Sequence, residues 1–311
     1  MNSFLIEPSP HIKSTASTQK IMLHVIIALF PSVVAGTVIF GLRALLLVVL
    51  CATFCVLAEY IFNIITKREQ TVSDLSAVVT GVLLGLNLPV SLPVYMAAIG
   101  SAVAIIVAKQ FFGGLGQNFA NPAITARIVL MLSFASYMTS WTEPFAYMNG
   151  TDAVASATPL SMESGLPSYL DMFLGMRSGC IGETCVAAIL LGGIYLISLK
   201  IINPVTPVAF VGTVALCCFL RGGDVLMEVM SGGLMLGAFF MATDYATTPI
   251  TTKGKLIFAI GCGLITFVIR EFGSYPEGVS YAILIMNILT PQIDKITMSR
   301  PFGVRKGADS K

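Results

Sequence analysis

Three ionisable side chains, Glu59, Arg127 and Asp244, lie within or at the ends of long apolar stretches of this sequence. A charge in a stretch that crosses a membrane is costly, and such residues usually serve an ion path or pair with an opposite charge. Glu59 can belong to an ion path or pair with Lys67 or Arg68, and both interpretations stay open. For Arg127 and Asp244, which we expect on the same, cytoplasmic side, we predict a structural pair that joins the two halves of the chain, with a cation site at Asp244 as the alternative.

The composition indicates that these apolar stretches cross a membrane. Apolar residues make up 56% of the chain and charged residues 11%, whereas a soluble domain has roughly 25% charged residues. A membrane-spanning helix needs about 20 mostly apolar residues. The sequence therefore predicts an all-α integral membrane protein with about ten transmembrane helices, over residues 21–41, 44–65, 75–89, 93–109, 122–140, 185–200, 204–220, 225–243, 255–270 and 276–291.

Basic residues give this arrangement a direction. Most of the 18 Lys and Arg residues fall in segments that ten helices place on one side of the membrane. Basic residues near helix ends are retained in the cytoplasm. We therefore predict a cytoplasmic N-terminal segment (1–20), a cytoplasmic C-terminal tail (292–311) and an outward loop at residues 141–184. The first 20 residues lack the apolar core and cleavage site of a signal peptide.

The ten helices fall into two halves, residues 21–140 and 185–291, that resemble each other in the order and spacing of their glycines. The segment Thr80-Gly-Val-Leu-Leu-Gly85 resembles Ser231-Gly-Gly-Leu-Met-Leu-Gly237. Each half has five helices, and an odd number makes the halves inverted repeats, related by an axis in the membrane plane.

In each half the third helix is rich in glycine and is followed by a polar segment with proline, at 87–93 and at 244–249. Interrupted helices at equivalent positions indicate a site near the bilayer centre. Close helix packing through small residues is the alternative reason for the glycines, and both can hold together.

The outward loop is unusually long, and loops of this length are often functional. It contains Asp152-Ala-Val-Ala-Ser-Ala-Thr158, whose small side chains let a partner approach the backbone. By composition alone this stretch is an ordinary loop. Cys180 and Cys185 either form a disulfide or remain free, and their spacing matches neither a zinc nor an iron–sulfur site.

Residues 152–158 resemble the acceptor sequence for covalent flavin attachment, in which a flavin transferase joins the phosphate of FMN to a Thr hydroxyl. Together with Gly113-Gly-Leu-Gly-Gln-Asn-Phe-Ala-Asn-Pro122, Gly182-Glu-Thr184 and Met241-Ala-Thr-Asp244, this makes the chain similar to the RnfD family, the D subunits of the Rnf electron-transport complex. That family is similar to NqrB, the B subunit of the sodium-pumping NADH:quinone oxidoreductase, in which a longer N-terminal extension is expected.

The resemblance implies that Thr158 carries FMN through a phosphoester bond, within a motif formed with Asp152, Ser156 and Ala157. The family's usual Gly before Ala-Thr is Ser156 here, and its usual Ser or Thr one position earlier is Ala155. Ser156 is therefore a competing hydroxyl, and Thr158 holds the position that matches the family's acceptor.

The resemblance also implies a role and partners. The chain is expected to relay electrons inside an enzyme complex that moves them between ferredoxin and NAD⁺ and translocates Na⁺ or H⁺. Covalent FMN is the expected cofactor, and a second, non-covalent flavin (riboflavin) at the repeat interface stays open. The expected partners are the A, B, C, E and G subunits of the Rnf complex, a flavin transferase during maturation and membrane lipid, with no nucleic acid. The expected location is the inner membrane of a prokaryote.

Two other functions fit the helices and the repeat. A channel or transporter for a small solute such as urea also uses inverted repeats with broken helices, but it has no use for a flavin acceptor. A passive assembly subunit without a cofactor is the second alternative. A covalent flavin would exclude both.

Overall fold

Two uninterrupted apolar runs form the first two helices of the computed structural model, which describes residues 17–148, 155–156, 167–273 and 278–298. They are α1 (Thr18–Phe40) and α2 (Leu42–Ile65), of 23 and 24 residues. At 1.5 Å per residue, each is long enough for a hydrocarbon core of about 30 Å. The Ser17 hydroxyl accepts a hydrogen bond from the Lys20 N–H and caps α1. Gly41, at a φ of 83°, lets the chain reverse between the two helices.

All ten predicted transmembrane segments contain helix, so the prediction of an all-α membrane protein is confirmed. Within the described residues, four helical runs have the length and apolar character to cross a membrane: α1, α2, Val94–Phe112 and α12 (Thr252–Phe272). The other main helices are α3 (Ser76–Leu86), α5 (Pro122–Ser133), α8 (Val186–Ser198), α9 (Val205–Arg221) and α13 (Val279–Thr297). Short helices connect them: α6 (Ala135–Met138), α7 (Tyr169–Leu174) and the 3-10 turns Val72–Asp74, Gln110–Phe112 and Ala146–Met148.

Two of the predicted helices are less regular than the apolar pattern suggests. The fourth runs as α4 (Val94–Ala102) and then widens into a π-helical turn at Val103–Val107. The eighth, predicted as one helix over 225–243, divides into α10 (Val225–Met230), α11 (Leu234–Leu236) and a π-helical turn at Gly237–Met241. The division falls at Gly232 and Gly233, whose φ values of 59° and 70° cost glycine little. Single π turns inside helices are often found at functional sites.

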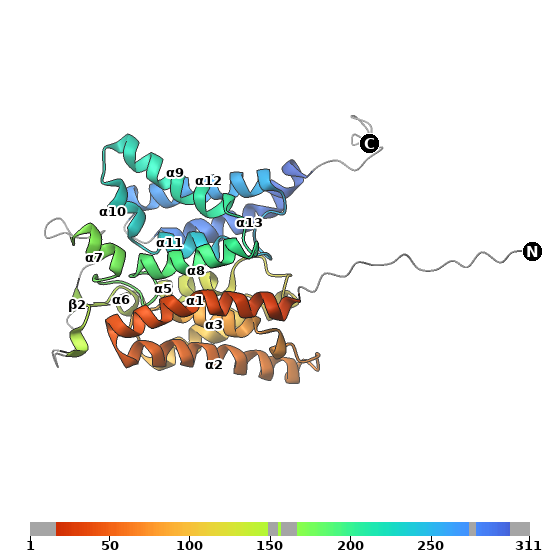
Figure 1. Ribbon diagram of the computed structural model, residues 1–311. Helices are drawn as coiled ribbons and strands as arrows, with labels where there is room; N and C mark the ends of the chain where they lie inside the picture. The colour runs from red at the N-terminus through yellow and green to blue at the C-terminus, as the bar shows by residue number, and fades with distance from the viewer. Residues whose placement is uncertain (1–16, 149–154, 157–166, 274–277, 299–311) are drawn as a thin grey trace, which may run out of the picture.

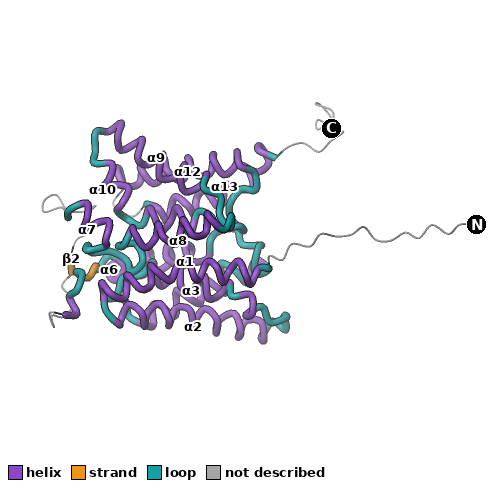
Figure 2. Tube along the Cα trace, in the orientation of Figure 1, coloured by secondary structure: helices purple, strands orange, loops and turns teal. Residues whose placement is uncertain are grey.

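The first two helices of each predicted half can be located in the bundle (Figure 1, Figure 2). The first helix of each half, α1 and α8, pack side by side in the middle of the bundle, while the second helices, α2 and α9, lie at opposite edges. This is the arrangement that two inverted repeats would give. The start of α1 and the end of α13 lie at one end of the bundle, and α7 and β2 lie at the other.

Glycines let the central helices approach closely. A Cβ on Gly81 of α3 would lie 2.5 Å from Cα of Ala52, and one on Gly85 would lie 2.8 Å from Cα of Val48, both in α2. A Cβ on Gly192 of α8 would meet the backbone carbonyl of Ala28 in α1. Close packing through small residues, one of the two reasons considered for the repeated glycines, is therefore confirmed at Gly81 and Gly85.

Candidate functional site

The two halves meet around an inner cavity of about 80 Å³. Its walls come from α1, α3 and the 115–122 segment on one side, and from the end of α8 and the segment after the second π turn on the other. They include Met22, Thr80, Leu83, Lys109, Asn118, Asn121, Leu196, Phe240, Thr243, Asp244 and Tyr245. Both π turns therefore end next to residues that line this cavity, Lys109 after the first and Thr243 after the second.

Two asparagines connect the cavity wall to the helices. Asn121 Oδ1 accepts from the Ala123 and Ile124 N–H groups and caps α5, while the side-chain NH₂ of Asn121 donates to the Met241 carbonyl at 3.4 Å, joining the two halves. Asn118 is buried, and its Oδ1 has no hydrogen-bond partner among the described residues. An unsatisfied buried acceptor in a cavity wall is suited to a ligand that donates a hydrogen bond.

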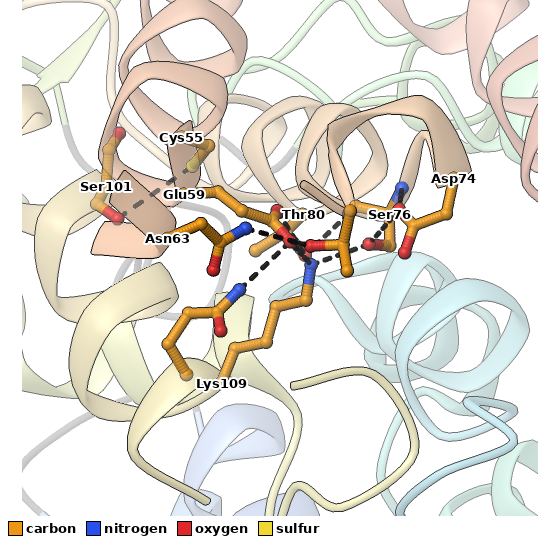
Figure 3. A network of polar contacts seen from close by, with 10 residues as sticks. Cys55, Glu59, Asn63, Asp74, Ser76, Thr80, Ser101 and Lys109 are labelled. Atoms are coloured by element: carbon orange, nitrogen blue, oxygen red, sulfur yellow. Dashed lines mark hydrogen bonds and ion pairs between the residues drawn. The ribbon is translucent and has the colours of Figure 1, made fainter. Parts of the chain in front are cut away.

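A buried ion pair lies beside the cavity (Figure 3). Lys109 Nζ lies 2.9 Å from Glu59 Oε2, and the side chains are 2% and 0% exposed. Lys109 also donates to the Ser76 hydroxyl at 2.6 Å. Glu59 Oε1 further accepts from the Thr71 hydroxyl at 2.6 Å and from the Gln110 amide at 3.0 Å. Both charges are therefore surrounded by the hydrogen bonds that a buried pair requires.

Pairing of Glu59 with Lys67 or Arg68 was one of the two interpretations left open, and the structure pairs Glu59 with Lys109 instead. Arg68 donates to the Gln110 carbonyl and lies over the Phe62 ring, 5.8 Å from its centroid. The Glu59 side chain lies between α2 and the end of the fourth helix, where Lys109 follows the π turn. Lys109 ends the predicted helix over residues 93–109, and nothing in the sequence showed that its side chain would be buried.

The predicted pair of Arg127 with Asp244 is also wrong. Arg127 Nη1 donates to Asn87 Oδ1 at 2.8 Å, and Nη2 donates to Cys180 Sγ at 3.4 Å. The Asp244 carboxylate instead accepts from the Ala246 N–H and the Thr247 hydroxyl of its own turn. Arg127 of α5 therefore contacts the residue that caps the end of α3, Asn87, and the segment that contains Cys180.

Arg127 has an acidic neighbour that the sequence did not single out as a charge partner. Glu183 is buried, and its Oε2 lies 2.9 Å from the position of a Cβ on Gly233, while Arg127 Nη1 lies 3.8 Å from the same point. Gly182-Glu-Thr184 was noted as part of a motif, which was the only signal available. Arg177 stabilises this segment, because its Nη2 donates to the Glu183 backbone carbonyl at 2.8 Å.

The outward loop is attached to the bundle at several points. Strand β1 (Trp141–Thr142) pairs antiparallel with β2 (Ala155–Ser156), with Trp141 opposite Ser156. Near the loop's end, the Tyr169 hydroxyl of α7 donates to Asp224 at 2.5 Å. This bond and the N–H groups of Met227 and Leu226 hold the pKa of the Asp224 carboxyl below its ordinary value. No disulfide joins Cys180 to Cys185, which was one of the two possibilities considered for them.

The acceptor motif is only partly within the described residues. Ser156 lies in β2, whereas Asp152, Ala157 and Thr158 lie outside the described residues. The pairing of the two strands therefore places Ser156, in the middle of the motif, beside Trp141.

Comparison with known proteins covers almost the whole chain. The sequence profile of the NQR2, RnfD, RnfE family matches residues 5–303. The D subunit of the Na(+)-translocating ferredoxin:NAD(+) oxidoreductase complex of Acetobacterium woodii is 49% identical over 97% of this chain and 96% of its own length. The D subunit of the proton-translocating ferredoxin:NAD(+) oxidoreductase complex of Clostridium ljungdahlii is 44% identical over 98% of each chain. The D subunit of an ion-translocating oxidoreductase complex of Stutzerimonas stutzeri is 37% identical over 93% of each. With ten helical segments, two linked halves and a match of this extent, the chain belongs to the NQR2, RnfD, RnfE family.

Proposed function

We propose that this chain is the D subunit of an ion-translocating ferredoxin:NAD⁺ oxidoreductase complex and relays electrons within it. The observation that carries the proposal is the near-complete match to relatives with that name, at 49% and 44% identity. One of these relatives is named for Na⁺ and the other for H⁺, so either ion is a candidate here. The A, B, C, E and G subunits of the complex are the proposed partners.

The relay is proposed to use FMN joined by a phosphoester to Thr158. The acceptor motif supports this assignment, as does the pairing of β2 with β1, which anchors Ser156 two residues away. Asp152, Ser156 and Ala157 form the rest of the motif that a flavin transferase would recognise. FMN supplies electron-transfer chemistry when bound, whereas the chain supplies its position and surroundings. The paired strands and the Tyr169–Asp224 bond would limit how far that position can move.

A second, non-covalent flavin such as riboflavin is proposed for the repeat interface. Small-molecule sites usually measure about 300–1,000 Å³, and the inner cavity alone is smaller. It shares Ile21, Met22, Leu115, Asp244 and Tyr245 with a neighbouring cavity of about 560 Å³. The two together suit a ring system, and Asn118 Oδ1 provides an acceptor for a ring N–H. Asp244 lines both cavities, which supports its proposed place in the ion path. Glu59 is kept as a second candidate for that path.

The proposed orientation has both termini in the cytoplasm and the flavin loop on the outer face of a prokaryotic inner membrane. The distribution of basic residues supports this orientation, and so does the location of the start of α1 and the end of α13 opposite α7.

The test is mass spectrometry of the tryptic peptide 128–177 from the purified complex, with in-gel flavin fluorescence after denaturation. Thr158→Ala should lose the FMN mass and the fluorescence, and the matched variant Ser156→Ala should keep both. Loss in Ser156→Ala with retention in Thr158→Ala would move the acceptor to Ser156. A peptide without flavin in the unsubstituted chain would refute the covalent relay.

A further inference from the structure

A third cavity, of about 530 Å³, opens where α8 ends and where α9 and α12 begin. It adjoins the inner cavity, with which it shares Ile201, Ile202, Thr243 and Tyr245, and it belongs to the side proposed as cytoplasmic. The other lining residues are Ile197, Lys200, Asn203, Pro204, Thr206, Thr248 and Lys255.

The charge of this cavity is one-sided. Lys200 and Lys255 line it, and none of its lining residues is acidic. The ion pairs among the described residues involve neither lysine. By contrast, the neighbouring cavity of about 560 Å³ is lined by Asp244 and Asp294 without a lysine. Two lysines that line one cavity without a carboxylate among the lining residues favour an anionic ligand.

Neutral donors accompany the two charges. Thr206 is 2% exposed, and it is one of the residues that line the cavity. Elsewhere, as at Thr213, a helix threonine donates to the carbonyl four residues earlier. Thr206 lies in the first turn of α9, where no such helical carbonyl stands behind it. Asn203 Oδ1 accepts from the Val205 N–H at 3.0 Å, which leaves the Asn203 NH₂ group as a donor.

The backbone conformation of Lys200 indicates that a lysine is not required at this position by the turn itself. Its φ is 56°, in the left-handed region that favours glycine at the end of a helix. A lysine at this position is less favourable than glycine for the fold, and it places an ammonium group at the cavity.

We propose that this cavity binds a phosphate group through Lys200, Lys255 and the Thr206 hydroxyl. A phosphate presents several charged oxygens that can accept from two ammonium groups and a hydroxyl at once. An anionic phospholipid headgroup of the cytoplasmic leaflet or free phosphate can supply it. Basic pockets between transmembrane helices on this side are suited to lipid headgroups. The site does not depend on the proposed flavins, and it is tested without measuring electron transfer.

The experiment is native mass spectrometry of the full chain in neutral detergent, titrated with phosphatidylglycerol, phosphatidylcholine or inorganic phosphate. We expect a 1:1 adduct with phosphatidylglycerol and weaker retention of phosphatidylcholine, whose choline cation would face the lysines. Lys200→Gly, which suits the backbone, and Lys255→Ala should each weaken the adduct about tenfold or more. Thr206→Val should weaken it by a smaller factor. Lys253→Ala is the matched control, because Lys253 is an exposed neighbour that does not line the cavity.

The outcomes separate the sources of the phosphate. A lysine-dependent adduct with inorganic phosphate that competes with the lipid assigns the site to free phosphate, and an adduct with the lipid alone assigns it to a headgroup. Equal weakening by Lys253→Ala would overturn the proposal in favour of general surface charge. The absence of any lysine-dependent adduct would also overturn it, provided that the variants unfold at the temperature of the unsubstituted chain.

Discussion

The Lys109 ammonium group lies 2.9 Å from the Glu59 carboxylate, and the two side chains are 2% and 0% exposed. Glu59 comes from α2, and Lys109 follows the π turn of the fourth helix. The pair therefore fixes the distance between two helices at the side of the inner cavity. Its attraction has to offset the cost of removing two charges from water.

Removing one member of this pair should be more harmful than removing both. Lys109→Met leaves the Glu59 carboxylate buried without its counter-charge, which costs on the order of 3–5 kcal/mol. The double variant Glu59→Leu/Lys109→Met should unfold at a temperature closer to that of the unsubstituted chain than Lys109→Met alone. The measurement is thermal unfolding of the chain in detergent, with Lys67→Met as an exposed control. A double variant less stable than Lys109→Met would show that the pair is not coupled in this way.

Arg127 and Asp244 should behave as independent sites. They share no partner among the described contacts, since Arg127 contacts Asn87 and Cys180 while Asp244 contacts its own turn. The effects of Arg127→Ala and Asp244→Ala on stability should therefore add within about 0.5 kcal/mol. Arg127→Ala and Asn87→Ala should deviate from additivity by about 0.5–3 kcal/mol, because they remove two ends of one hydrogen bond. Double-mutant cycles on the assembled complex measure these couplings. Strong coupling between Arg127 and Asp244 would show that the two residues do form a pair.

The Tyr169–Asp224 bond should make the docking of α7 on α10 dependent on pH. The pKa of Asp224 is lowered, so its contribution is complete above the ordinary carboxyl value and is lost as the pH falls through the lowered one. The hydrogen bond to Asp224 raises the pKa of Tyr169, so the contribution of the phenol is lost only as the pH rises through that raised value. Docking should therefore hold between about pH 4 and pH 10.

Tyr169→Phe tests this dependence directly. Carbon NMR titration of the Asp224 carboxyl should show a higher pKa in the variant, still below the ordinary value because the Met227 and Leu226 N–H groups remain. An unchanged pKa would mean that the capping of α10, and not Tyr169, lowers it.

The crossing of α8 with α1 should not tolerate a larger residue at Gly192. The Cβ of Gly192→Ala would meet the Ala28 carbonyl and lie 2.9 Å from Phe240 Cζ. Because a backbone atom cannot move aside cheaply, we expect a loss of about 1–3 kcal/mol. Gly212→Ala is the matched control: it lies in α9, nothing is within 4 Å of its Cβ position, and it should stabilise the helix by about 0.5–1 kcal/mol. Equal unfolding temperatures for the two variants would contradict this packing.

The orientation can be measured at Ser168, an exposed residue that precedes α7. In intact cells, Ser168→Cys should react with a membrane-impermeant maleimide, because five predicted transmembrane helices separate it from the N-terminus, which is proposed to be cytoplasmic. The unsubstituted chain controls for its own cysteines, and Lys253→Cys on the opposite face should react only after permeabilisation. The reverse pattern would invert the topology.

The membrane class, the approximate positions of the helices and the family could all be predicted from the sequence. These follow from local information: about 20 apolar residues make a transmembrane helix wherever they lie, and motifs such as Gly113 to Pro122 are read without coordinates. The small residues at Gly81 and Gly85 also indicated close packing, which the contact with α2 confirms. The outward orientation of the loop at residues 141–184 and the role of Thr158 stay predictions.

Only the tertiary structure decided which charges meet. Lys109, Glu59 and Ser76 come from three different helices, and Arg127 meets Asn87 and Cys180 from two other segments. A helix pattern fixes which residues share a face, but the partner depends on rotation and depth in the bundle. Here the rotation of the helices and the depth of their residues depend on the π turn before Lys109 and on the break at Gly232 and Gly233. Such local departures from regular helix depend on packing against neighbouring helices, so the apolar pattern could not reveal them.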